Sequence, residues 1–156
     1  MSLVGILSDT HDHLDRTRAA VALFNSAGAD LVVHCGDYVS QFTVRELSGL
    51  DAKLVGVFGN NDGDRAALRQ RADEAGFELH AGLHRFEFAG RSFAASHEPV
   101  TPPECDFYLH GHTHRRKLAG REPLVINPGE ACGWLTGAGS VALLDTESGK
   151  VDFKEL

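Results

Sequence analysis

Three short apolar segments mark the first half of the chain, and each ends abruptly in polar residues. These segments are 3–7, 31–33 and 53–58. A short, nearly uninterrupted apolar run is typical of a strand that is buried on both faces, as in a parallel sheet. The pattern therefore predicts three parallel strands, each delivering polar side chains to its carboxyl end.

Helical spacing of apolar residues follows each of these strands. A helix is predicted over 14–27, with Gly28 as its stop, and further helices over 39–47 and 64–75, the last with Asp64 as its N-cap. Alternating strands and helices favour an open α/β sheet, in which ligands bind where the strands end. We therefore expect the polar side chains after the three strands to line one site.

The pattern changes after Gly76, where short β-type segments separated by glycines replace the helical spacing. Turns are predicted at Ala89-Gly90 and at 148–150. The predicted strands are 77–79, 84–88, 91–95, 105–110, 123–126, 139–145 and 150–154. The length favours a second sheet packed on the first over a separate unit, so we expect one domain spanning residues 1–156.

The composition limits the classes of partner. The chain has 156 residues, 42% of them hydrophobic and 24% charged, which is typical of a globular domain. Its formal net charge of -7 disfavours nucleic acid and anionic membranes as partners. A small anionic substrate would therefore need a local positive charge, which bound divalent cations could supply.

The cysteines and the apolar runs indicate the cellular setting. Cys35, Cys105 and Cys132 are odd in number and form no C-x-x-C pair, so we expect no disulfide framework. No apolar run has the length of a membrane span, and the start lacks the pattern of a signal peptide. We expect a cytoplasmic protein.

Five polar clusters at predicted strand ends carry the candidate chemistry. They are Asp9-x-His11, Gly36-Asp37, Gly59-Asn60-Asn61-Asp62, Ser96-His97 and Gly111-His112-Thr113-His114. Carboxylate, amide and imidazole ligands without thiolate suit Mn, Fe, Ni or Zn better than Ca or Mg. Seven such ligands are too many for one tetrahedral ion, but they suit two ions that share a carboxylate.

The ordered set D-x-H, G-D, G-N-x-D, H and G-H-x-H closely resembles that of the calcineurin-like metallophosphoesterases. Segments 6–11, 33–37 and 127–129 further resemble the compact phosphodiesterases of the YfcE type. The resemblance implies a four-layer αββα sandwich, in which two mixed β-sheets are flanked by helices. It covers residues 4–129, nearly the whole chain.

The resemblance also implies a ligand set and a reaction. One ion would be held by Asp9, His11 and His114, and the other by Asn60, His97 and His112, with Asp37 bridging both. The two divalent transition-metal ions would be manganese, with nickel, iron or zinc as alternatives. A hydroxide bridging them would hydrolyse a small-molecule phosphate ester, preferably a phosphodiester.

Other functions remain open on the sequence. The chain could be a protein-interaction scaffold that retains the metal site, as in the retromer subunit that resembles this fold. A nuclease is disfavoured by the acidic charge and by the lack of a basic or aromatic groove. Relatives of this kind often assemble, so a homo-oligomer is also open.

Asn61 and Asp62 complete the predicted site. Larger relatives have a histidine that aids the leaving group where this chain has Asn61, and an amide can donate a hydrogen bond but cannot release a proton near pH 7. We therefore expect a preference for acidic leaving groups, with His13 as the candidate substitute acid. Asp62 is expected to accept hydrogen bonds that orient the loop.

Several other residues near the motifs receive weaker interpretations. His97 could be displaced by the following Glu98-Pro99, and Trp134 could be a stacking platform or an interface anchor. Glu130 stands where relatives have serine, and the sequence offers no account of it. Structural roles are expected for His34, Cys35, His80, His84 and His110.

Overall fold

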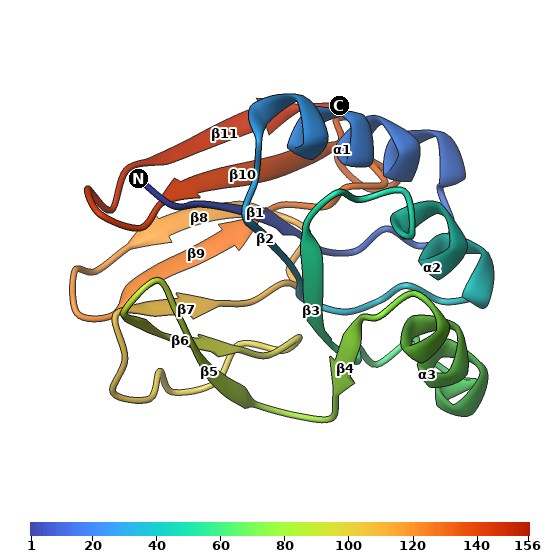
Figure 1. Cartoon of the computed structure of the whole chain (residues 1–156), viewed down its shortest axis with the longest axis horizontal. Coiled ribbons are helices and arrows are strands. Elements are labelled where there is room, and N and C mark those ends of the chain that lie inside the picture. Colours follow the sequence, from blue (N-terminus) through green and yellow to red (C-terminus); the bar gives the residue numbers. More distant parts are fainter.

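The computed structural model describes all residues 1–156, which form two β-sheets and three α-helices (Figure 1). The first sheet has the strand order β11-β10-β1-β2-β3-β4. Strands β1 to β4 pair in parallel, and β10 pairs antiparallel with both β1 and β11. Its strands are β1 Leu3–Leu7, β2 Leu31–His34, β3 Lys53–Val57, β4 Glu78–His80, β10 Ser140–Asp145 and β11 Val151–Glu155.

The second sheet has the strand order β5-β6-β7-β9-β8 and is also mixed. Strands β6, β7 and β9 run parallel, whereas the two edge strands pair antiparallel with their neighbours. Its strands are β5 His84–Phe88, β6 Arg91–Ala95, β7 Phe107–Leu109, β8 Arg116–Ala119 and β9 Leu124–Pro128. The parallel centre of each sheet therefore gathers several carboxyl ends at one edge.

The three helices are α1 Leu14–Ala27, α2 Gln41–Leu47 and α3 Arg65–Glu74. As predicted, Asp64 caps α3 by accepting a hydrogen bond from the Ala67 N–H at 3.0 Å, and α1 ends at Gly28 with φ 68°. Helix α2 begins two residues later than predicted, because Val39 has φ 78°, which no helical residue adopts. None of the helices has the length and apolarity needed to cross a membrane.

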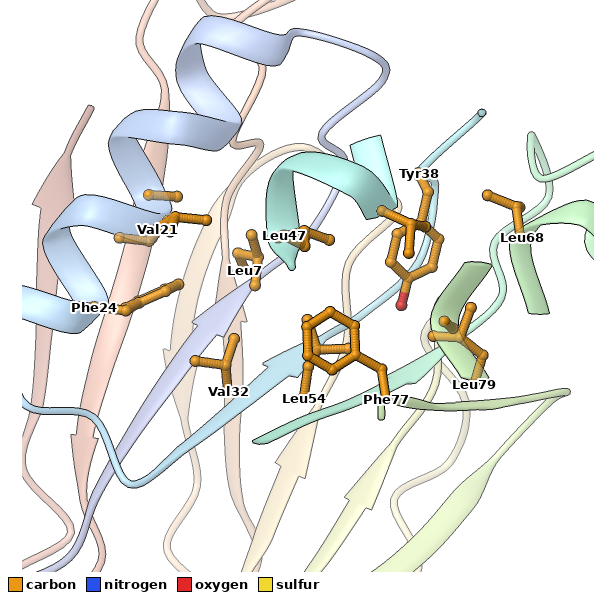
Figure 2. Close-up of a cluster of buried hydrophobic side chains, with 14 of the residues drawn as sticks. Leu7, Val21, Phe24, Val32, Tyr38, Leu47, Leu54, Leu68, Phe77 and Leu79 are labelled. Carbon is orange, nitrogen blue, oxygen red and sulfur yellow. The ribbon is translucent and has the colours of Figure 1, made fainter. Parts of the chain in front are cut away.

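Two hydrophobic clusters hold the layers together. In the first cluster, side chains of the three helices, among them Phe24, Leu47 and Leu68, pack on the first sheet (Figure 2). In the second, Ile6 and Val57 of the first sheet lie among side chains of the second sheet. Neighbouring residues of β1 thus point into different clusters, which explains why the apolar runs are uninterrupted.

The predicted α/β architecture of two packed, mixed sheets is confirmed, and so are the three helices. The number of layers differs from the prediction. All three helices contribute to the cluster on the first sheet, and the second sheet has no helix on its outer face. The chain after α3 forms only strands and turns, so it has no segment that could build a fourth layer.

Strand β8 was not expected from the sequence. All four of its residues are exposed, and it lies at the edge of the second sheet beside β9. An edge strand without a buried position leaves no apolar alternation that sequence reasoning could detect.

Candidate metal centre

Loops at the carboxyl ends of five strands deliver the predicted ligands. Strands β1, β2 and β3 of the first sheet and β6 and β7 of the second all end at this edge. Because each cluster follows its strand directly, the fold brings all seven predicted ligands together. They are Asp9, His11, Asp37, Asn60, His97, His112 and His114.

Asp9, His11 and His114 form what we call the Asp9 group. The Asp9 Oδ1 atom lies 3.3 Å from His114 Nε2 and 3.6 Å from His11 Nε2. Asp9 is fully buried, and both its Oδ1 atom and His11 Nε2 lack a hydrogen-bond partner. A buried polar atom without a partner is costly, and a cation among these atoms would remove that cost. The group therefore fits a divalent ion.

Asn60, His97 and His112 form what we call the Asn60 group. The Asn60 Oδ1 atom lies 2.8 Å from His97 Nε2 and 3.1 Å from His112 Nδ1. The other ring nitrogen of His97 lies 2.8 Å from the Cys35 carbonyl, to which it donates, so Nε2 presents a lone pair to the group. His97 is therefore not displaced by Glu98-Pro99.

Asp37 lies between the two groups. Its Oδ2 atom is 3.3 Å from His11 Nε2 and 3.3 Å from His97 Nε2. The neighbouring carboxylates of Asp37 and Asp9 raise the pKa of His11 to about 9. Burial of Asp37 would raise the pKa of its own carboxyl, but the neighbouring His11 and His97 rings and the hydrogen bonds from Asn61 outweigh it and hold that pKa well below its usual range.

Asn61 and Asp62 both form hydrogen bonds with Asp37. The backbone N–H of Asn61 donates to Asp37 Oδ1 and its side-chain amide to Oδ2, each at 2.8 Å. The buried carboxylate of Asp62 accepts from the backbone N–H groups of Asp37, Val39 and Gly59 at 3.0, 2.8 and 2.7 Å. Asp62 thus ties two loops together, as expected for a residue that accepts hydrogen bonds to orient the loop.

The ligand loops have strained backbones. Positive φ angles occur at Asp9 (54°), His11 (40°), Asp37 (62°), His112 (66°) and His114 (59°). Such conformations cost about 1–3 kcal/mol each and persist where the surrounding structure enforces them, often at functional sites. Glycine is required at 59, where a Cβ atom would lie 2.1 Å from the carboxylate of Asp37. The loops are therefore shaped for the ligands rather than for local stability.

Glu130 joins the centre through a contact with His114 that the sequence did not reveal. It is 1% exposed, and its Oε2 atom accepts a hydrogen bond of 2.6 Å from His114 Nδ1, which leaves His114 Nε2 facing Asp9. Burial would raise the pKa of Glu130, but hydrogen bonds from His114, Thr136 and Leu135 outweigh it and lower that pKa to about 2. A carboxylate behind a histidine fixes the ring and increases its basicity toward a metal.

His34 and Asn127 support the ligand loops from below. His34 is fully buried, accepts from the Gly36 N–H at 3.0 Å and stacks on Tyr38. Burial lowers its pKa to about 3. The Asn127 amide donates to the Gly111 carbonyl at 2.9 Å, which holds the turn that carries His112 and His114.

The remaining histidines do not join the centre. His80 and His84 stack on each other with ring centroids 3.5 Å apart, and His110 is buried beside Asn127. His13 accepts a hydrogen bond from the Arg16 N–H through Nδ1 and stacks on Trp134. Only the other ring nitrogen of His13 could exchange a proton with a substrate.

A cavity of about 400 Å³ opens beside the Asn60 group. Asn60 and His97 line one side of it, and Phe58, Leu83 and Val100 supply apolar walls. Its size lies within the range of small-molecule sites. The centre therefore has room for a substrate next to the candidate ligands.

Comparisons with known proteins agree with this geometry. The chain is 36% identical to phosphodiesterase MJ0936 of Methanocaldococcus jannaschii, over 98% of this chain and 97% of that protein. The solved structure of a novel archaeal phosphodiesterase superposes with a TM-score of 0.91 at 35% identity, covering 99% of both chains.

More distant structures share the fold. YfcE, a phosphoesterase from E. coli, has a TM-score of 0.71 at 20% identity, covering 99% of this chain and 98% of its own. Vps29 from Chaetomium thermophilum has a TM-score of 0.70 at 16% identity, covering 100% and 97%.

The family model of the calcineurin-like phosphoesterase superfamily domain matches residues 1–149. A match over nearly the whole chain is joined by a close relative that is named a phosphodiesterase. The chain therefore belongs to the calcineurin-like phosphoesterase superfamily and is a hydrolase of the metal-dependent phosphoesterase class.

Proposed function

We propose that the chain is a two-metal phosphodiesterase that hydrolyses a small-molecule phosphate ester. The Asp9 group would hold one ion, the Asn60 group the other, and Asp37 would contribute to both. The observation that carries the proposal is the position of Asp37 Oδ2, 3.3 Å from a histidine nitrogen of each group. One carboxylate oxygen within reach of two ligand sets is what a shared ligand requires.

Two bound divalent ions would supply a nucleophilic hydroxide at neutral pH and stabilise negative charge on the phosphoryl oxygens. The protein's own residues fix the geometry around them. Asp62 and Asn61 hold the Asp37 loop, and Glu130 orients His114. The Asn61 amide nitrogen carries a second N–H, which can donate to a phosphoryl oxygen.

The structure supplies no evident acid for the leaving group on the Asn61 side. Asn61 cannot release a proton near pH 7, and its amide donates to Asp37. General-acid help contributes about 10²–10⁴-fold in rate, so esters of acidic alcohols should be preferred. The slope of rate against leaving-group pKa tests this preference, and a flat dependence would show that an acid exists, with His13 as the first candidate.

The donor set also supports a choice of metal. Carboxylate and amide oxygens with imidazole nitrogens favour manganese as the working ion, with nickel, iron or zinc as alternatives. Three free cysteines fit a reducing compartment, so we propose a cytoplasmic setting. We further propose that residues 1–156 act as one metallophosphoesterase domain.

The test is a hydrolysis screen over diesters and monoesters with protein reconstituted in turn with Mn, Ni, Fe and Zn. We expect turnover of activated diesters and its loss in Asp37→Asn, with metal content measured in parallel. Activity that survives this substitution would contradict the shared role of Asp37. Metal binding without hydrolysis of any ester would favour the scaffold function instead.

A further inference from the structure

Trp134, the only tryptophan of the chain, stands beside the Asp9 group and is 63% exposed. Its indole N–H donates to the backbone carbonyl of His11 at 3.3 Å. Its ring stacks on His13 with centroids 4.5 Å apart and planes 25° apart. The indole is therefore fixed to the loop that carries a candidate metal ligand, while much of its surface is open to solvent.

The loop that carries Trp134 is anchored on both sides of the indole. Before it, the Ala131 and Cys132 N–H groups donate to the carbonyls of Ser8 and Asp9 at 2.9 and 3.1 Å.

After the indole, Glu130 Oε1 accepts from the Leu135 and Thr136 N–H groups at 3.0 and 2.6 Å. The other oxygen of the same carboxylate holds His114. An aromatic side chain positioned in this way loses little conformational entropy when a ligand stacks on it.

An exposed, immobilised indole next to the proposed phosphate-binding centre can stack on an aromatic ring of a substrate. Aromatic pairs contribute about 0.5–1.5 kcal/mol beyond the area that they bury. A separate consideration points to the same substrates: Asn61 cannot protonate a leaving group, and aryl alcohols are acidic enough to leave without that help.

We propose that Trp134 and His13 form a stacking platform for an aromatic ring on the alcohol part of the phosphate ester. The inference rests on the proposed function, and it names the class of substrate. Trp134 is then a specificity-determining residue of the Asp9 side of the centre.

Binding can be tested without turnover, because all intrinsic tryptophan fluorescence comes from Trp134. Manganese-loaded protein is titrated with phenylphosphonate and with methylphosphonate, which share the anionic head and cannot be hydrolysed as esters. We expect quenching by the phenyl compound and a preference for it of about three- to tenfold. Equal affinity for the two compounds, or no change in fluorescence, would overturn the platform.

Two variants separate stacking from general apolar contact. Calorimetric titration of Trp134→Ala should show the phenyl preference reduced to near unity, whereas Trp134→Phe should keep part of it. Leu135→Ala is the matched control, since Leu135 is the 76% exposed neighbour without an aromatic ring. An equal loss of preference in Leu135→Ala would contradict stacking.

A kinetic comparison completes the test. Esters of 4-chlorophenol and hexafluoroisopropanol have leaving groups of similar acidity, so a selective rise of KM for the aryl ester in Trp134→Ala reports on the ring. If no ester is hydrolysed but the phenyl preference exists, the proposed function fails and the platform stands. If esters are hydrolysed without that preference, the platform fails. A change of oligomeric state in Trp134→Ala, together with no quenching in the wild-type protein, would identify an interface anchor instead.

Discussion

The two ligand groups of the centre are built with different charges. The Asp9 group contains a full carboxylate, and a second carboxylate, Glu130, stands behind His114. The Asn60 group contains no carboxylate, and His97 is backed by the carbonyl of Cys35. Asp37 is the only negative charge that both groups share.

The two groups also differ in how many of their buried polar atoms have hydrogen-bond partners. In the Asp9 group, Asp9 Oδ1 and His11 Nε2 are buried without hydrogen-bond partners. In the Asn60 group, His112 Nδ1 lies 3.1 Å from the amide oxygen and can donate a hydrogen bond to it. An ion therefore relieves more cost and meets more charge in the Asp9 group. We expect this group to hold its ion more tightly, and the Asn60 group to lose its ion first on dialysis.

Asp37→Asn should have the largest effect, because it removes the one charge that both groups use. We expect hydrolysis to fall on the order of 10³-fold and the bound metal to fall below two ions per chain. Asp51→Asn serves as the control for loss of charge alone, because Asp51 is exposed in the loop between α2 and β3. Two tightly bound ions in Asp37→Asn would show that the groups are independent.

Glu130→Gln should weaken the Asp9 group selectively. Loss of a carboxylate behind a metal-binding histidine typically costs about 10–100-fold in affinity, and Glu130→Asp should restore part of it. Competition with a chelator measures the affinity of each ion separately. The matched control is Glu98→Gln, since Glu98 is exposed and follows His97. A larger loss from the Asn60 group would reverse the comparison.

Asn60→Asp should reduce the difference between the groups, because it gives the Asn60 group a charge of its own. We expect its ion to bind roughly tenfold more tightly, as a carboxylate near a cation adds more than 1 kcal/mol even under partial screening. The same chelator competition reports the change. An unchanged affinity would mean that ligand geometry, rather than charge, limits this group.

His34 provides a prediction that can be tested in the metal-free protein. Its folded pKa of about 3 lies below the unfolded value of about 6.5, so its contribution to stability is complete above pH 6.5 and is lost as the pH falls toward 3. The free energy of unfolding should decrease by up to about 1.4 kcal/mol per pH unit in that range.

Denaturant unfolding of the chelated wild type and of His34→Gln at several pH values provides the measurement. Because other histidines titrate in both proteins, only the difference between the two slopes is used. Parallel slopes would show that His34 takes up a proton in the folded protein. They would also mean that His34, which supports the ligand loops, can carry a positive charge while the protein stays folded.

The sequence by itself determined the three buried strands, the three helices and the residues placed after each strand. This was possible because periodicity and strand ends are local properties, and because ligand chemistry is carried by residue type. The D-x-H, G-D and G-H-x-H motifs could thus be placed at one sheet edge from the sequence alone.

Tertiary structure alone decided the rest. Glu130 faces His114, and Asp62 holds the backbone of Asp37, through contacts between residues 16 and 25 positions apart. Which segments become neighbours also decides three other features: the absence of a fourth layer, the edge strand β8 and the contact of Trp134 with the His11 carbonyl. Such contacts arise from the packing of two sheets, and a side chain's spacing along one strand carries no information about the loop that will lie against it.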